Sequence, residues 1–146
     1  EYSDITSGAG TWDEAAGSGK RVNGCASLEN ACNGEILIVP AVRKSDHKKV
    51  HLALQSVPLG PQRANVGIYY KELPEDIASI TPTSFAANWE KPYRVSDTTS
   101  AYSTMLQLKN GNIAFYYEES LTLNGWGYDM VYKEIPLKVI TSDQYQ

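Results

Sequence analysis

Alternation of apolar and polar positions recurs along the chain and predicts β-strands. In residues 50–57, Val50, Leu52 and Leu54 alternate with more polar neighbours, which is the period of a half-buried strand. Residues 36–39 instead form an unbroken apolar run, and we expect a strand buried on both faces there. No segment keeps a 3.6-residue period, so a helical domain is not expected.

Turn residues divide this pattern into further strands. Asn33-Gly34 and Asn110-Gly111 are hairpin signals, and Pro136 is expected to interrupt the last strand. The polar, proline-bounded stretch 74–92 is expected to be a surface connection with a helical turn. The strands expected from these patterns are 26–31, 35–42, 50–57, 66–73, 93–96, 102–108, 113–118 and 128–140.

The order of these elements predicts an all-β fold. Two groups of strands, each spanning about 45–50 residues, fit two four-stranded antiparallel blades of a β-propeller. The same spacing fits a β-sandwich of seven or eight strands, and periodicity does not choose between the two. Residues 1–24, rich in Gly, Ser, Ala and Asp, are expected to form a loop-rich N-terminal segment with a short helical turn at 12–16. The β-domain is expected to span residues 25–146.

Composition narrows the class of protein. The 146 residues suffice for one domain, and the hydrophobic fraction of 42% is typical of a folded chain. A net charge of −4 argues against a nucleic-acid partner. The chain contains no run of about 18 apolar residues, so no transmembrane helix is expected. The N-terminus has no initiator Met, basic region or apolar region, so we expect a processed or truncated chain rather than a signal peptide.

The cysteines and histidines predict no metal site and no cofactor. Cys25 and Cys32 are too few for a disulfide framework, and with only two histidines they do not form a zinc-binding pattern. We expect two ordinary thiols near a hairpin. The ten tyrosines suit either a half-exposed sheet or a wet, sugar-binding surface.

Three residues at expected strand ends carry candidate chemistry. The hairpin at Asn110-Gly111 brings Tyr102, at the start of one strand, and Glu118, at the end of the next, to the same rim. Arg63 comes immediately before another strand, and its guanidinium can bind a carboxylate in a bidentate manner. A tyrosine has a pKa near 10 and needs a neighbouring base or a positive field to act as a nucleophile.

Four segments, in this order, resemble the C-terminal third of the sialidase (neuraminidase) family. The resemblance covers roughly residues 24–135, and the Ala-Tyr-Ser and Tyr-Glu elements are its most specific parts. The spacing of 39 residues between the arginine and the tyrosine (102 − 63) also agrees with the family. The four segments are Gly24-Cys25-Ala26-Ser27-Leu28, Gln62-Arg63-Ala64-Asn65-Val66-Gly67-Ile68, Ala101-Tyr102-Ser103-Thr104-Met105 and Ile113-Ala114-Phe115-Tyr116-Tyr117-Glu118.

The resemblance implies a six-bladed propeller, of which this chain supplies about the last two blades. It implies an exo-α-sialidase, a retaining glycoside hydrolase that releases terminal sialic acids from glycoconjugates with a tyrosine nucleophile. Tyr102 would be that nucleophile. Arg63 would be the third member of an arginine triad that binds the substrate carboxylate. Glu118 would hold another arginine of the triad in place and would not itself contact the substrate.

The resemblance also implies missing parts. The acid/base aspartate, the glutamate that activates the tyrosine and the first two triad arginines belong to earlier blades, so this chain alone is expected to be inactive. We expect the remaining blades as another chain, a cleaved N-terminal part or a symmetric partner, and a secreted or periplasmic location. The alternatives are a non-catalytic carbohydrate-binding β-propeller and a different propeller glycosidase.

Overall fold

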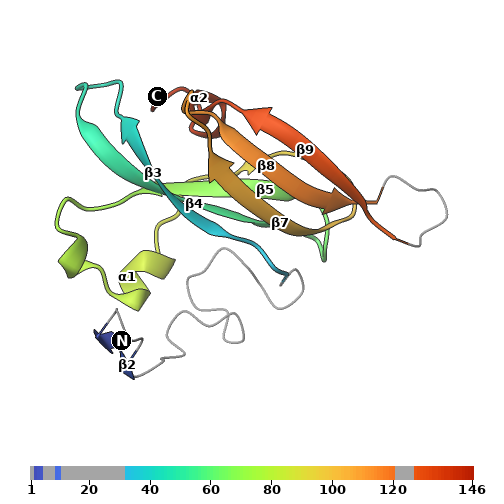
Figure 1. Cartoon of the computed structure of the whole chain (residues 1–146), viewed down its shortest axis with the longest axis horizontal. Coiled ribbons are helices and arrows are strands. Elements are labelled where there is room, and N and C mark those ends of the chain that lie inside the picture. Colours follow the sequence, from blue (N-terminus) through green and yellow to red (C-terminus); the bar gives the residue numbers. More distant parts are fainter. Residues whose placement is uncertain (1, 5–8, 11–31, 121–126) are drawn as a thin grey trace.

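In the described residues, two antiparallel β-sheets, one of four strands and one of three, share one hydrophobic core (Figure 1). The computed structural model describes residues 2–4, 9–10, 32–120 and 127–146. Strands make up most of the regular structure in these residues, which confirms the all-β prediction at the level of fold class.

The first sheet contains four strands in sequential order, each antiparallel to its neighbour. The strands expected at 35–42, 50–57, 66–73 and 93–96 are confirmed, with small shifts at their ends. The strand expected at 26–31, which would complete a hairpin at Asn33-Gly34, lies outside the described residues. The observed strands are β3 (Ile36–Val42), β4 (Lys49–Pro58), β5 (Val66–Glu72) and β6 (Tyr93–Arg94).

The expectation that β3 is buried on both faces is wrong. Ile36 and Ile38 are each 47% exposed, because β3 pairs only with β4 among the described strands and one of its faces is uncovered. The strand buried on both faces is β4, in which Leu52, Ala53 and Leu54 are fully buried. In the sequence, the small Ala53 stands with the more polar positions of residues 50–57, so β4 is expected to be only half-buried. In the structure β4 lies between β3 and β5, and Ala53 is fully buried.

The connection between β5 and β6 folds back on the first sheet. It contains the 3₁₀ helix η2 (Ile77–Ser79) and the short helix α1 (Pro82–Ala86), as the helical turn expected in 74–92 suggested. The ammonium group of Lys71 on β5 donates to the carbonyls of Ser84 and Ala87 at 2.9 and 2.6 Å. The same ammonium lies 5.7 Å from the ring centroid of Trp89. These contacts hold the connection so that β6 returns to the edge of β5.

The second sheet has the strand order β7-β8-β9. Its strands are β7 (Ser100–Gln107), β8 (Ile113–Glu119) and β9 (Asp129–Ile135). The expected Asn110-Gly111 turn joins β7 to β8, and Gly111 has the left-handed φ of 85° that such a turn requires. Pro136 interrupts the expected strand, so β9 ends at Ile135, and the residues expected to continue it to 140 instead form the short helix α2 (Leu137–Ile140).

The core lies between the two sheets. Figure 1 shows the second sheet, drawn in orange and red, lying across β4 and β5, and β7 is in contact with β3 and β4. Each fully buried aliphatic or aromatic side chain in this layer contributes about 1.5–3 kcal/mol. The fully buried side chains of the cluster include Val39, Leu52, Leu54, Val66, Ile68, Ile113, Phe115 and Tyr117.

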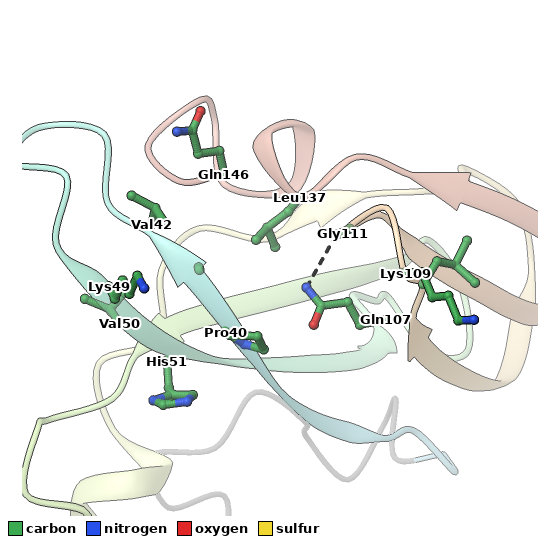
Figure 2. Close-up of a pocket in the computed structure, with 12 residues that line it drawn as sticks. Pro40, Val42, Lys49, Val50, His51, Gln107, Lys109, Gly111, Leu137 and Gln146 are labelled. Carbon is green, nitrogen blue, oxygen red and sulfur yellow. Dashed lines mark hydrogen bonds between the residues drawn. The ribbon is translucent and has the colours of Figure 1, made fainter.

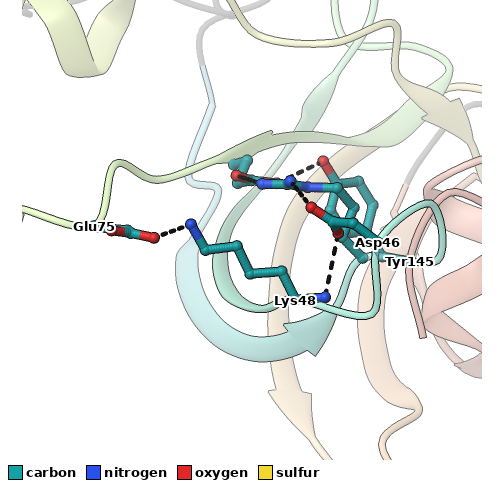
Figure 3. Close-up of polar contacts among 6 residues, drawn as sticks. Asp46, Lys48, Glu75 and Tyr145 are labelled. Atoms are coloured by element: carbon teal, nitrogen blue, oxygen red, sulfur yellow. Dashed lines mark hydrogen bonds and ion pairs between the residues drawn. The ribbon is translucent and has the colours of Figure 1, made fainter.

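An ion-pair network ties the C-terminal residues to the first sheet (Figure 3). The guanidinium of Arg43 donates to Glu72 through Nε at 3.0 Å and through Nη2 at 2.5 Å. Asp46 accepts from Nη1 at 2.7 Å, and the Tyr145 hydroxyl donates to Glu72 at 3.0 Å. The hydrogen bonds from Arg43 hold the pKa of Glu72 below its ordinary value. Burial and the nearby Glu72 raise the pKa of Tyr145 to about 12.

Two short strands occur in the segment expected to be loop-rich. β1 (Tyr2–Asp4) and β2 (Ala9–Gly10) form a separate two-stranded antiparallel sheet. The helical turn expected at 12–16 and the residue Cys25 lie outside the described residues.

Candidate functional site

Arg63 lies on the short loop between β4 and β5, and hydrogen bonds fix the shape of that loop. The N–H of Leu59 donates to the carbonyl of Asn65 at 3.0 Å, and the Asn65 side chain donates to the carbonyl of Gly60 at 2.7 Å. Gln62 and Asn65 have left-handed φ angles of 55° and 60°. Such angles cost free energy in non-glycine residues and persist only where surrounding contacts impose them.

The same loop is bound to the start of the second sheet. The N–H of Ser100 donates to the carbonyl of Arg63 at 2.9 Å, and the N–H of Asn65 donates to the carbonyl of Thr98 at 2.9 Å. An isolated antiparallel bridge also pairs Ala64 with Thr99. Arg63 is therefore held beside the first residues of β7.

Tyr102 lies in a β-bulge near the start of β7. Ser100 pairs with Glu119 and Ser103 pairs with Tyr117, so the two residues between them on β7 face a single residue of β8. A bulge bends its strand and changes the direction of a side chain, and bulges are frequent next to active sites. The side chain of Tyr102 is 46% exposed, which leaves it open to a ligand.

The bulge brings the three predicted residues together. The guanidinium carbon of Arg63 lies 6.0 Å from the centroid of the Tyr102 ring, within the range of a cation–π contact. The carboxylate of Glu118 accepts the backbone N–H of Tyr102 at 3.2 Å. Arg63 is exposed and forms no ion pair with any other described residue. Its guanidinium is thus available to an anionic ligand that also contacts Tyr102.

Glu118 has a contact that the sequence did not indicate. The resemblance assigns it to a triad arginine that belongs to an earlier blade, and that role stays a prediction. Within the described residues, its carboxylate satisfies the N–H of the bulged residue Tyr102. Glu118 therefore fixes the backbone of the residue proposed to react.

Cys32 is a neighbour of this cluster that sequence reasoning missed. Burial raises the pKa of its thiol, while the charge of Arg63 and a hydrogen bond from the Asn33 backbone act in the opposite direction. Glu118 is near enough to raise it further. The thiol is therefore protonated at neutral pH. No signal in the sequence links Cys32 with residues 31 and 86 positions away.

A second polar cluster lies on the other face of β8. Ser96 donates to the buried carboxylate of Glu119 at 2.5 Å, and Lys133 donates to the carbonyl of Val95 at 2.9 Å. These side chains line a cavity of 400 Å³. The hydroxyl of the fully buried Tyr117 has no hydrogen-bond partner among the described residues. Because Glu119 and Lys133 both have internal partners, we assign this cluster a structural role.

A cavity of 580 Å³ lies at the far end of β7 from Tyr102 (Figure 2). Figure 2 shows that its labelled side chains come from β3, β4, the end of β7, the β7–β8 turn, α2 and the C-terminal residue. Lys49, His51 and Lys109 carry its basic groups, but Figure 2 shows them pointing in different directions. This cavity contains none of the three predicted site residues, so the candidate site remains at the Arg63–Tyr102–Glu118 rim.

The described residues contain no group of three or more His, Cys, Asp or Glu side chains that could hold a metal ion. None of the helices in the described part has the length and apolar character needed to cross a membrane.

Comparison with known proteins adds no family assignment. No protein-family model matches this chain, and no curated protein matches it either.

Proposed function

We propose that this chain is the C-terminal part of a retaining exo-α-sialidase. The observation that supports this best is the Arg63–Tyr102–Glu118 cluster, in which an exposed arginine, with no ion-pair partner among the described residues, faces a half-exposed tyrosine held by a carboxylate. Sialic acids carry a carboxylate at the anomeric carbon. An enzyme that cleaves such a sugar needs a cation that binds this carboxylate and a nucleophile that reaches the anomeric carbon beside it.

The proposed chemistry follows from the charge of the substrate. The guanidinium of Arg63 binds the sugar carboxylate and orients the anomeric carbon toward Tyr102. A carboxylate nucleophile would be repelled by the sugar carboxylate, whereas a neutral phenol that loses its proton as it attacks is not. The Tyr102 oxygen gives its proton to the activating glutamate and forms a bond to the anomeric carbon, while the bond to the leaving oxygen breaks and that oxygen takes a proton from the acid/base aspartate; both carboxyl groups are proposed to lie on the remaining blades. Water then cleaves the glycosyl-tyrosine bond with net retention.

The two sheets are proposed to be the last two blades of a six-bladed propeller. The outer face of the second sheet supports this, because large apolar side chains are exposed there. Tyr116 and Tyr132 lie opposite each other in the β8–β9 ladder, are each 47% exposed, and have ring centroids 4.8 Å apart. Leu106 and Met130 are 63% and 65% exposed. A neighbouring blade would cover this face, as apolar patches of this kind usually mark an interface.

The proposal requires the rest of the enzyme. The remaining blades, as another chain or a cleaved N-terminal part, are proposed to supply the acid/base aspartate, the activating glutamate and two further arginines. This chain alone is then inactive. Because sialylated glycoconjugates are displayed outside the cytoplasm, we propose a secreted or periplasmic location.

The test is Tyr102→Phe in the complete protein, assayed with a fluorogenic sialoside. We expect turnover to fall by several orders of magnitude, because the variant lacks the nucleophilic oxygen, while sialic acid binding persists. Tyr93→Phe is the control, since Tyr93 lies on β6 of the first sheet, outside the Arg63–Tyr102–Glu118 cluster and outside the face proposed to meet another blade, and it should retain activity.

Other results would replace the proposal. Sialic acid binding by the wild-type protein without hydrolysis would indicate a non-catalytic carbohydrate-binding propeller. Hydrolysis of another sugar alone would indicate a different propeller glycosidase. Full activity of the Tyr102→Phe variant would exclude Tyr102 as the nucleophile.

A further inference from the structure

The segment that leads into β3 is fastened to β4. The N–H of Ser56 donates to the carbonyl of Glu35 at 3.0 Å, and the N–H of Glu35 donates to the Ser56 hydroxyl at 3.0 Å. Ser56 is fully buried. At Gly34, an added Cβ would lie 1.9 Å from the carbonyl oxygen of Ser56, so only glycine permits this close approach. The position of Glu35 is therefore set by β4.

From this position, Glu35 reaches the strand that carries Tyr102. One carboxylate oxygen accepts the backbone N–H of Met105 and the hydroxyl of Thr104, each at 2.5 Å. The carbonyl of Asn33 accepts the N–H of Ser103 at 3.1 Å. A charged acceptor makes a stronger hydrogen bond to a backbone N–H than a neutral one does.

These contacts occupy the free edge of β7. N–H groups of residues i and i+2 point to the same side of a strand, so those of Ser103 and Met105 both face away from β8. No described strand pairs with that edge. Without Glu35, the Met105 N–H would lose its acceptor at a residue that is only 4% exposed.

The contacts begin one residue after Tyr102. Because Tyr102 lies in a bulge, the β7–β8 ladder does not fix its backbone by regular pairing. Its backbone is held on one side by Glu118 and on the other side by the contacts of Asn33 and Glu35 with the next three residues. A displacement of about 1 Å in a reacting group can cost on the order of 100-fold in rate.

We propose that Glu35 is a positioning residue, whose carboxylate fixes the strand segment that aims Tyr102 at the substrate. This inference rests on the proposed sialidase function. Glu35 does not touch the substrate, and it acts through the backbone of β7.

The test compares three variants of the complete protein. In Glu35→Ala, we expect kcat on a fluorogenic sialoside to fall on the order of 10–100-fold with KM changed less than about twofold. Glu35→Gln should restore most of kcat, because the amide oxygen can still accept from Met105 and Thr104. Glu90→Ala is the control, since Glu90 is exposed and lies on the connection before β6.

Hydrogen exchange supplies a readout that does not need activity. The Met105 amide should exchange faster in Glu35→Ala than in the wild type, while the Phe115 amide in the middle of β8 keeps its protection. Retained protection at Phe115 shows that the variant is folded, so a loss of kcat in it cannot be attributed to unfolding.

The outcomes separate this inference from the proposed function. Unchanged exchange at Met105, or unchanged kcat in Glu35→Ala beside an inactive Tyr102→Phe, overturns the positioning role and leaves the sialidase proposal standing. An equal loss of kcat in Glu35→Gln also overturns it, because a residue that acts only as a hydrogen-bond acceptor should tolerate the amide. A wild-type protein that does not hydrolyse sialosides overturns both.

Discussion

At the scale of single residues, Tyr102 combines exposure of its side chain with restraint of its backbone. The ring is 46% exposed and faces Arg63, while the N–H behind it is bound by Glu118. Exposure admits a ligand, and restraint keeps the phenol oxygen in one place while it reacts. Arg63 complements this arrangement because it has no competing carboxylate among the described residues.

Arg63→Lys in the complete protein should weaken substrate binding. A lysine keeps the positive charge but cannot form the two parallel hydrogen bonds of a guanidinium, so we expect KM for a sialoside to rise about tenfold or more. Initial-rate kinetics would measure this. Arg94→Lys is the control, because Arg94 lies on β6 rather than on the loop of Arg63. An unchanged KM in Arg63→Lys would argue against a bidentate contact.

At the scale of elements, hydrogen bonds outside the regular strand ladders join segments that are far apart in the sequence. The Arg63 loop is tied to β7, the segment before β3 is tied to β7, and the C-terminal residues are tied to β3 and β5. The last of these ties depends on ionised Glu72, whose pKa is lowered chiefly by the hydrogen bonds from Arg43.

The Glu72 tie predicts how stability depends on pH. A carboxylate with a lowered folded-state pKa stabilises the protein above its unfolded pKa, near 4.3, and this contribution is lost as pH falls through the folded-state value. Glu72→Gln should therefore lower the midpoint of thermal unfolding at pH 7, and its difference from the wild type should shrink below about pH 4. Glu90→Gln serves as control. A difference that stays constant from pH 7 to pH 3 would contradict this role for Glu72.

At the scale of the whole molecule, the two faces of the second sheet differ. Met105, Ile113 and Phe115 pack on the first sheet, whereas Leu106, Tyr116 and Met130 are exposed. One face of this sheet is buried in the core, and the other exposes large apolar side chains to water. An exposed apolar patch of this kind usually marks an interface. This is why we propose a further blade on that side.

Leu106→Lys tests for that blade. Ile77 has nearly the same exposure, 62% against 63%, but lies on the connection after β5. If a blade covers Leu106 in the complete protein, Leu106→Lys should lower the free energy of unfolding by about 2–3 kcal/mol, because a charge would be buried. Ile77→Lys should stay within about 0.5 kcal/mol of the wild type. Urea denaturation would measure both, and equal, small effects would argue against the neighbouring blade.

The sequence alone determined the local features of the fold. Apolar patterns and turn residues located seven of the described strands, the Asn110-Gly111 turn joined β7 to β8, and Pro136 ended β9. These features depend on residues close together in the chain, through backbone preference and side-chain period. The same reasoning placed Tyr102 and Glu118 on one rim, because a hairpin is itself local.

Only the tertiary structure decided which surfaces and partners those elements have. The exposure of Ile36 and Ile38 follows from the uncovered face of β3, which its apolar sequence does not encode. The hydrogen bond between Glu35 and Met105 joins residues 70 positions apart, and Cys32 comes close enough to Arg63 and Glu118 for their charges to shift its pKa only in the folded protein. Such contacts form when separate elements dock, and the free energy that selects them is shared among many residues. For this reason a local pattern predicted the strands, whereas the surroundings of Tyr102 required the folded protein.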